Sequence, residues 1–284
     1  MANPALMPTS PLRANFHYVV LMDLSKASYT ALKQAVNMAK RTSALIEILY
    51  VERPLKVVGN ENQLSALREL ESESQNSKRK LQNLIELVRE EEQIQTIFTY
   101  RVGHPLTQIK AYLSETRPHL VFYGKKKSNI GRWWPGISQY LLQAYQGAVF
   151  ISRENGSKHL DRSSSIGSIG STTRSWSSEV VKTLSKNHRG NHVVFKLSAL
   201  KKNPVNENHN RFTEDPKALN EATTFEFEGK HHLTQGISRY AAKCNIGLFC
   251  WKRPLGELRQ DDKNIRIEKL IEKLDMPLLI TGQS

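Results

Sequence analysis

Short apolar runs alternate along the first half of the chain with longer segments in which apolar residues recur every three or four positions. The first pattern is typical of buried strands and the second of amphipathic helices. The expected strands are residues 17–23, 44–51, 93–100, 120–123 and 148–152. The expected helices are residues 29–39, 61–92, 106–116 and 137–146. This alternation predicts an α/β fold with a Rossmann-like, open, parallel sheet of five strands and helices on both faces.

The segment after the fifth expected strand is serine-rich, contains SSSIGSIGSTTRSWSS and lacks a sustained apolar period, which favours a linker. Farther on, residues 233–253 align without a gap with residues 106–126, and residues 277–281 align with residues 148–152. Matches in the same order indicate an internal repeat. The expected organisation is a flexible leader (1–15), a first domain (16–153), a linker (154–190) and a second domain (191–284).

The second copy is expected to be a truncated form of the first. Its first strand is placed near residue 193, and too few residues follow before the next apolar run to form a helix, a strand and a long helix. One strand–helix unit is therefore expected to be missing. In this alignment Leu197 takes the place of Asp23 and Trp251 takes the place of Gly124, so we expect ligand binding only in the first copy.

The stretch 120–138, LVFYGKKKSNIGRWWPGIS, is the strongest candidate for a binding site. The expected strand ends at Gly124, a basic loop without acids follows, and a helix is expected to begin at Gly136. Glycine turns, basic side chains and helix N-termini are one way to hold a phosphate. An ordinary strand–helix connection with solvated charges gives the same pattern, so both interpretations stay open.

Ligands of a parallel sheet bind beside the carboxyl ends of its strands. The binding residues expected there are Asp23, Val51, Gly124, Lys125, Lys126, Lys127, Gly136 and Ser138. Asp23 is suited to accept hydrogen bonds from an adenine or a ribose, or to cap the next helix as a turn acid. Arg132, Trp133 and Trp134 are candidates for stacking a base or contacting a partner, or for packing onto the second domain.

The 284-residue chain has a formal net charge of +14 and an isoelectric point near 9.7, which favours acidic partners. Its 2 cysteines leave no room for a disulfide framework. The N-terminal segment lacks the continuous apolar core of a secretory signal, and no stretch is apolar enough to span a bilayer, so a cytoplasmic location is expected. No nucleophile elbow, P-loop or zinc-protease motif is present, and His104, His231 and His232 lack a third metal ligand, so we expect neither catalysis nor a metal.

Residues 16–153 resemble the universal stress protein (UspA-like) family, and the whole chain is similar to a tandem of two such domains with a degenerate second copy. The motifs that carry the resemblance are VVLMDLSKASYTAL, ILYV, VGHP, LVFYG and AVFIS. The resemblance implies a five-stranded parallel sheet, adenine-nucleotide binding at the strand ends in some members, and dimerisation through the last strand. A tandem chain can satisfy that dimerisation internally.

Nucleotide-binding members of that family carry Gly, two residues, Gly, nine residues, then Gly followed by Ser or Thr. Here Gly124 fits the first glycine, but Lys127 stands at the second and Ile137 separates Gly136 from Ser138. A β-carbon at position 127 obstructs the close approach that a triphosphate needs, which weighs against ordinary ATP binding. The basic loop also resembles the stress-protein domain of potassium-sensing histidine kinases, which does not use the ATP motif.

Three functions are compatible with these features. The first is a non-catalytic regulatory module that needs no cofactor but senses an adenine nucleotide or a cyclic dinucleotide at the first domain. The second is an adaptor that has lost nucleotide binding and regulates an acidic protein partner, such as the cytosolic domain of a transporter. The third, a charge-driven nucleic-acid binder, is disfavoured because no groove-reading or RNA-binding motif accompanies the charge.

Overall fold

The computed structural model describes residues 14–54, 63–126, 136–154, 161, 164–169, 178–198, 223–228, 233–253, 274 and 276–282. The strands of the first half are β1 (Phe16–Met22), β2 (Ala44–Glu52), β3 (Thr96–Val102), β4 (Leu120–Lys125) and β5 (Val149–Arg153). Its helices are α1 (Lys26–Thr42), α2 (Gln63–Glu92), α3 (Pro105–Thr116), the short α4 (Ile137–Gln139) and the π-helix η1 (Tyr140–Ala144).

The second half is built in the same way. Its strands are β6 (Ser165–Ile169), β7 (His192–Ser198), β8 (Thr223–Glu228), β9 (Ile246–Lys252) and β10 (Leu278–Thr281). Its described helices are α5 (Glu179–Lys186) and α6 (Leu233–Lys243).

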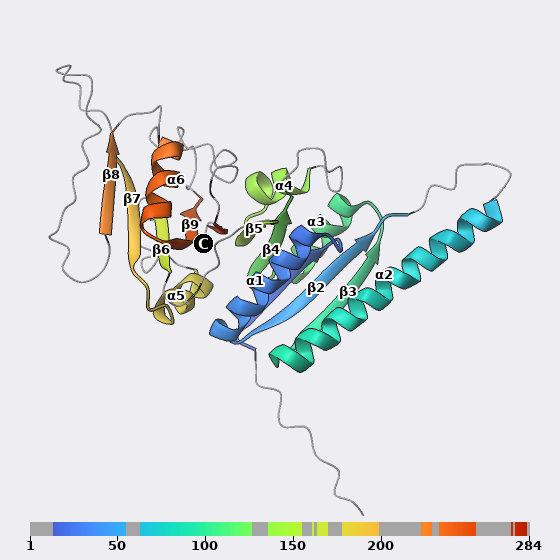
Figure 1. Ribbon diagram of the computed structural model, residues 1–284. Coiled ribbons are helices and arrows are strands. Elements are labelled where there is room, and N and C mark those ends of the chain that lie inside the picture. The colour runs from blue at the N-terminus through green and yellow to red at the C-terminus, as the bar shows by residue number, and fades with distance from the viewer. Residues whose placement is uncertain are drawn as a thin grey trace, which may run out of the picture.

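All ten strands lie in one sheet, in the order β3-β2-β1-β4-β5-β10-β9-β6-β7-β8 (Figure 1). Every neighbouring pair is parallel except β5 and β10, which are antiparallel. Read outward from that pair, both halves place a first strand between the second and fourth strands. The predicted α/β fold with a mostly parallel open sheet is therefore confirmed.

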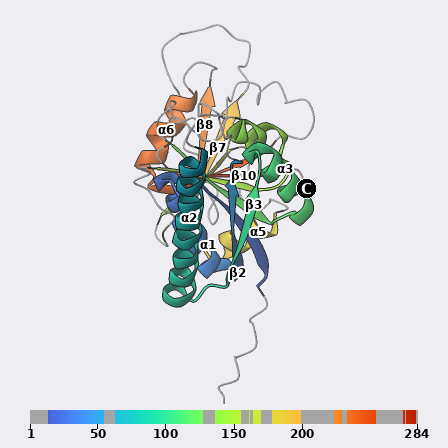
Figure 2. The same cartoon turned by 90° about the vertical axis from the view of Figure 1, so that its right-hand side faces the viewer.

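Helices cover both faces of the sheet. In Figure 2 the long helix α2 lies on one side of β2 and β3, and α3 lies on the other. One buried cluster collects the apolar faces of α1, α2 and α5, and the second collects those of α3, η1 and α6. Strands β1 and β2 are buried on both faces, which explains why they read as continuous apolar runs.

The prediction of a linker across residues 154–190 is wrong for the residues described there. Strand β6 lies inside that segment and pairs with both β7 and β9, and helix α5 follows it. Strand β7 is consequently the second strand of its half, not the first. The expectation of a missing strand–helix unit is wrong for the same reason, since all five strands are present, and Leu197 does not correspond to Asp23.

The gapless alignment of residues 106–126 with 233–253 is displaced by one residue in the structure. Ile109 and Tyr112 of α3 face the same core cluster as Ile237 and Tyr240 of α6, which corresponds to a shift of one position. The same shift relates Arg117 (φ 44°) and Asn245 (φ 48°), the left-handed residues that follow the two helices. Side chains alternate between the faces of a strand, so one residue is enough to exchange the buried sides.

Candidate functional site

The candidate site lies where the chain order of the sheet reverses. From β1 the chain continues to β2 and β3 on one side, whereas β4 and β5 lie on the other. Such switch points leave a crevice beside the carboxyl ends of the two central strands, where open α/β sheets bind ligands. Asp23 follows β1 and Lys126 follows β4, so the structure brings these two predicted residues together.

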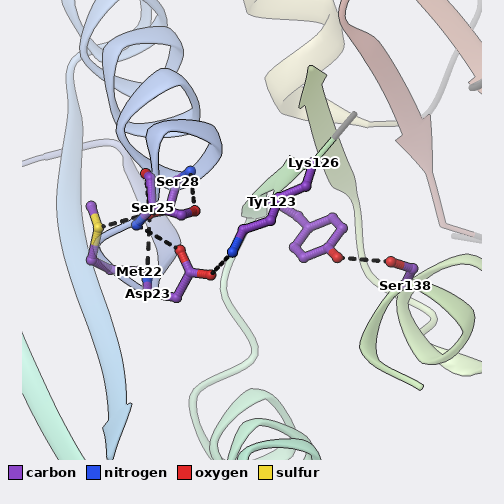
Figure 3. Close-up of polar contacts among 7 residues, drawn as sticks. All are labelled: Met22, Asp23, Ser25, Ser28, Tyr123, Lys126 and Ser138. Carbon is purple, nitrogen blue, oxygen red and sulfur yellow. Dashed lines mark hydrogen bonds and ion pairs between the residues drawn. The ribbon is translucent and has the colours of Figure 1, made fainter. Parts of the chain in front are cut away.

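The turn between β1 and α1 is held by hydrogen bonds from its own side chains. The Ser25 amide donates to Asp23 Oδ1 at 3.0 Å, and Ser25 Oγ accepts from the Ser28 amide at 3.3 Å (Figure 3). Ser25 is therefore the N-cap of α1, while Asp23 orders the turn before it. Leu24, between them, has a left-handed conformation with φ 59°, which is uncommon for a residue with a branched side chain.

The second oxygen of Asp23 faces the end of β4. Lys126 Nζ lies 3.6 Å from Asp23 Oδ2, and the exposed fractions of the two side chains are 26% and 13%. This ion pair sits beside the N-terminus of α1, where the helix dipole is positive. The site therefore combines a partly accessible ammonium group, a carboxylate and a positive helix end. A phosphate oxygen interacts favourably with two of these three groups.

Gly124 has a packing role at the end of β4. A β-carbon there would lie 2.1 Å from Ala27 O and 2.7 Å from Ser28 N, both backbone atoms of the first turn of α1. The missing side chain thus lets the N-terminus of α1 lie directly against β4. From the sequence alone, close approach of a phosphate explains Gly124 as well as this close packing does.

Tyr123 connects β4 to α4. Its hydroxyl lies 2.7 Å from Ser138 Oγ, and the two side chains point toward each other (Figure 3). Burial raises the pKa of Tyr123, the bond to Ser138 lowers it, and the negative charge of Asp23 raises it again. The phenol therefore remains protonated at neutral pH and available for hydrogen bonding.

Other predicted residues lie apart from this crevice or outside the described residues. Val51, near the end of β2, is 5% exposed and packs in the core cluster beneath α3. Gly136 precedes α4 with φ 88°, a conformation that suits glycine, and Lys125 ends β4 half-buried. The residues that lie outside the described ranges are Lys127, Arg132, Trp133 and Trp134.

The sequence did not single out Ser25, Ser28 and Tyr123 as site residues. Ser28 is 2% exposed, accepts from the Asp23 amide at 3.4 Å and donates to Ser25 O at 2.9 Å. Two serines close behind an acid were the available signal, but such serines are also common helix caps. Tyr123 falls at the end of the expected strand 120–123, where the pattern treats it as an apolar strand residue.

Two further searches bear on the described residues. Among them, no three histidine, cysteine, aspartate or glutamate side chains lie close enough to hold a metal ion. None of the helices in the described ranges combines the length and the apolar character needed to cross a bilayer.

Comparison with known proteins identifies the fold. The Universal stress protein family model matches residues 16–153, and no curated protein matches the chain. The structure is similar to that of a universal stress protein from Archaeoglobus fulgidus DSM 4304, with a TM-score of 0.65, 15% sequence identity, and coverage of 96% of this chain and 100% of that one. A functionally unknown protein from Pseudomonas aeruginosa PAO1 has a TM-score of 0.52 and 12% identity over 93% of this chain and 92% of its own.

At these identities the structural likeness establishes the fold, and the family match establishes relationship for the first half. Residues 16–153 of this chain form a domain of the universal stress protein family.

Proposed function

We propose that this stress-response module is a non-catalytic sensor that binds a phosphate-bearing ligand, such as a nucleotide or cyclic dinucleotide, beside Asp23 and Lys126. The observation that carries the proposal is the ion pair between these residues at the N-terminus of α1. A ligand phosphate competes with Asp23 for Lys126, because it offers more negative charge and can also accept from first-turn amides. Tyr123 lies near enough to Asp23 for that carboxylate to raise its pKa, and its hydroxyl hydrogen-bonds Ser138.

The first test is a thermal-shift screen of the full chain against ATP, AMP and cyclic dinucleotides at low and at physiological salt. A ligand that binds only the folded protein raises Tm as its concentration exceeds Kd. We expect one class of nucleotide to raise Tm at physiological salt. The double variant K125E/K126E should abolish that shift.

The matched control is R79E/K80E, which makes the same charge change at two exposed positions of α2. It should retain the shift, because α2 lies away from the β1–β4 crevice. If neither variant alters the shift, the nucleotide binds elsewhere. If no nucleotide shifts the wild type, the sensor proposal is wrong.

A second candidate, an adaptor for an acidic protein, is favoured by the exposed surface of α1 and α5. Helix α1 contains no acidic residue, and Lys26 and Lys33 are exposed along it. Helix α5 lies beside it, where Asn187 Nδ2 donates to Arg41 O at 2.7 Å. The exposed Lys186 at the end of α5 extends the same basic surface.

This surface is testable with a fluorescent polyglutamate peptide as the probe. We expect K33E/K186E to weaken binding strongly and R79E/K80E to leave it nearly unchanged, although both lose the same charge. Equal loss in the two variants would show that net charge, rather than the α1–α5 surface, attracts the peptide. A duplex DNA competitor that binds more tightly than the peptide would favour the nucleic-acid alternative.

A further inference from the structure

The second half of the chain reaches into the first through one buried arginine. Arg253 directly follows β9 and is 7% exposed. Its Nη2 donates to Leu141 O at 2.7 Å and its Nη1 donates to Gly147 O at 2.9 Å. Both acceptors belong to the segment that links β4 to β5, on the opposite side of the β5–β10 junction.

Leu141 lies in the single turn of the π-helix η1, and Gly147 follows the end of that helix by three residues. The Tyr145 amide closes its last turn by donating to Tyr140 O at 2.8 Å. Carbonyl groups in the last turn of a helix lack intrahelical donors, and a cation at that end also matches the helix dipole. A guanidinium carries parallel N–H groups in a fixed fork, so one side chain can serve two carbonyls at once.

The segment that Arg253 holds also carries part of the candidate site. Helix α4 continues directly into η1, so Ser138 and Leu141 lie in adjoining turns of one helical segment. Ser138 in turn hydrogen-bonds Tyr123, next to Gly124 at the crevice. A displacement of η1 is therefore passed to Ser138 through continuous helical backbone.

We propose that Arg253 is a positioning residue, through which the second half of the chain fixes the α4–η1 segment and thereby the ligand crevice of the first half. This inference rests on the proposed phosphate site. It gives the second half a role other than that of a second sensor, since its own basic residue after the fourth strand is turned inward.

The strand register supports this asymmetry. Leu120 and Phe122 of β4 face the same core cluster as Leu248 and Cys250 of β9. The register thus makes Arg253 the counterpart of Lys125, which ends β4 half-buried, directly before Lys126. In the second half the equivalent cation is occupied by two carbonyl groups. By the same register the sequence has Pro254, which carries no charge, at the position of Lys126, so we expect one phosphate-bearing ligand per chain.

The test uses the full-length protein and three variants. R253K keeps the charge but cannot present two parallel donors, and R253Q removes the charge. R153Q is the matched control, because Arg153 also joins the halves, but its Nη1 donates to Leu274 O, at 3.0 Å, rather than to Leu141 or Gly147. Hydrogen–deuterium exchange of residues 136–147 reports the segment, and affinity for AMP reports the crevice.

We expect faster exchange at 136–147 in R253K and R253Q but not in R153Q, with AMP affinity reduced by about five- to tenfold in the two Arg253 variants. R253K retains a cation at this buried position, so it is expected to fold even if R253Q does not. Unchanged exchange at 136–147, or faster exchange with unchanged affinity, would overturn the positioning role. Failure of the wild-type protein to bind any nucleotide would instead contradict the proposed phosphate site. The exchange measurement would still test whether Arg253 holds the α4–η1 segment, because it needs no ligand.

Discussion

Gly124 and Glu47 illustrate how single residues in this chain are constrained by the backbone and side chains around them. Gly124 leaves space for the first turn of α1, because any β-carbon would overlap the Ala27 carbonyl at 2.1 Å. Glu47, in the middle of β2, is 5% exposed and lies 2.7 Å from His17 Nε2, with the Thr99 hydroxyl as a second partner. Gly124 is therefore constrained by the backbone packed against it, and Glu47 by the hydrogen bonds to its carboxylate.

Replacing Gly124 with alanine should destabilise the protein by about 1–3 kcal/mol, because overpacking forces backbone to move. The atoms in conflict are backbone atoms, so A27G should not rescue G124A. Urea unfolding of G124A, A27G and the double variant measures this. A double variant restored to the stability of A27G alone would show that the conflict lies with the Ala27 side chain instead.

Glu47 should make stability depend on acid pH. Burial alone raises the pKa of Glu47, but hydrogen bonds from His17, Thr99 and Tyr112 and the charge of His17 outweigh it and lower the pKa from 4.5 to about 2. Because the folded pKa lies below the unfolded value, the folded state binds fewer protons. The stabilisation from this carboxylate is therefore complete above about pH 4.5 and is lost as the pH falls toward about 2.

The variant E47Q should lower the free energy of unfolding near neutral pH by about 1.5–3 kcal/mol, the range for hydrogen bonds to a charged group. It should also flatten the decline of that free energy between about pH 5 and pH 3. Denaturant unfolding across this range is the measurement. Parallel curves for wild type and E47Q would mean that other carboxylates cause the acid sensitivity.

At the scale of elements, β6 is the least expected strand. Four of its five residues are buried, yet it is built from serine, isoleucine and glycine. The space above Gly167 is filled by Ile246 and Phe249 of β9, each with an atom 2.9 Å from where a β-carbon would lie. A neighbouring strand thus supplies the apolar volume that β6 lacks.

This position of β6 predicts a large effect of truncating Ile166, which is 1% exposed in the core cluster beneath α1 and α5. I166A should lose about 2–5 kcal/mol of unfolding free energy through lost burial and the cavity left behind. Lys186, exposed at the end of α5, offers a control, and K186A should have little effect. An I166A protein as stable as K186A would show that β6 contributes little to the core, as expected of a linker.

At the scale of the whole molecule, the two halves are joined edge to edge. Strands β5 and β10 pair antiparallel from Val149 with Ile280 to Ile151 with Leu278. Arg153 and Arg253 add hydrogen bonds across the same junction. The chain thereby covers, within one polypeptide, the strand edge that each half leaves open.

Separating the halves should expose this edge. A fragment of residues 1–155 keeps all strands of the first half but leaves apolar β5 unpaired, which favours self-association. Sedimentation velocity should show concentration-dependent dimers of the fragment and a monomeric full chain at the same concentrations. A fragment that stays monomeric throughout would mean that β5 does not need a partner strand.

The sequence alone determined the first half of the fold, because its strands and helices carry strong apolar periods and its motifs end at β1, β2 and β4. It also predicted that Asp23 and Lys126 lie close together, since both follow strands that end at the same edge of a parallel sheet. Net charge and the motifs of β1 and β4 pointed to a phosphate-binding role, which stays a proposal.

Only the tertiary structure decided the rest. The segment containing β6 has no apolar period of its own. It needs none, because Phe249 and Ile246 of β9 fill the space beside Gly167. A one-residue shift between α3 and α6 is invisible in a short alignment, yet it decides which side chains face which core. The burial of Arg253 against Leu141 depends on contacts 112 residues apart, which no local pattern encodes.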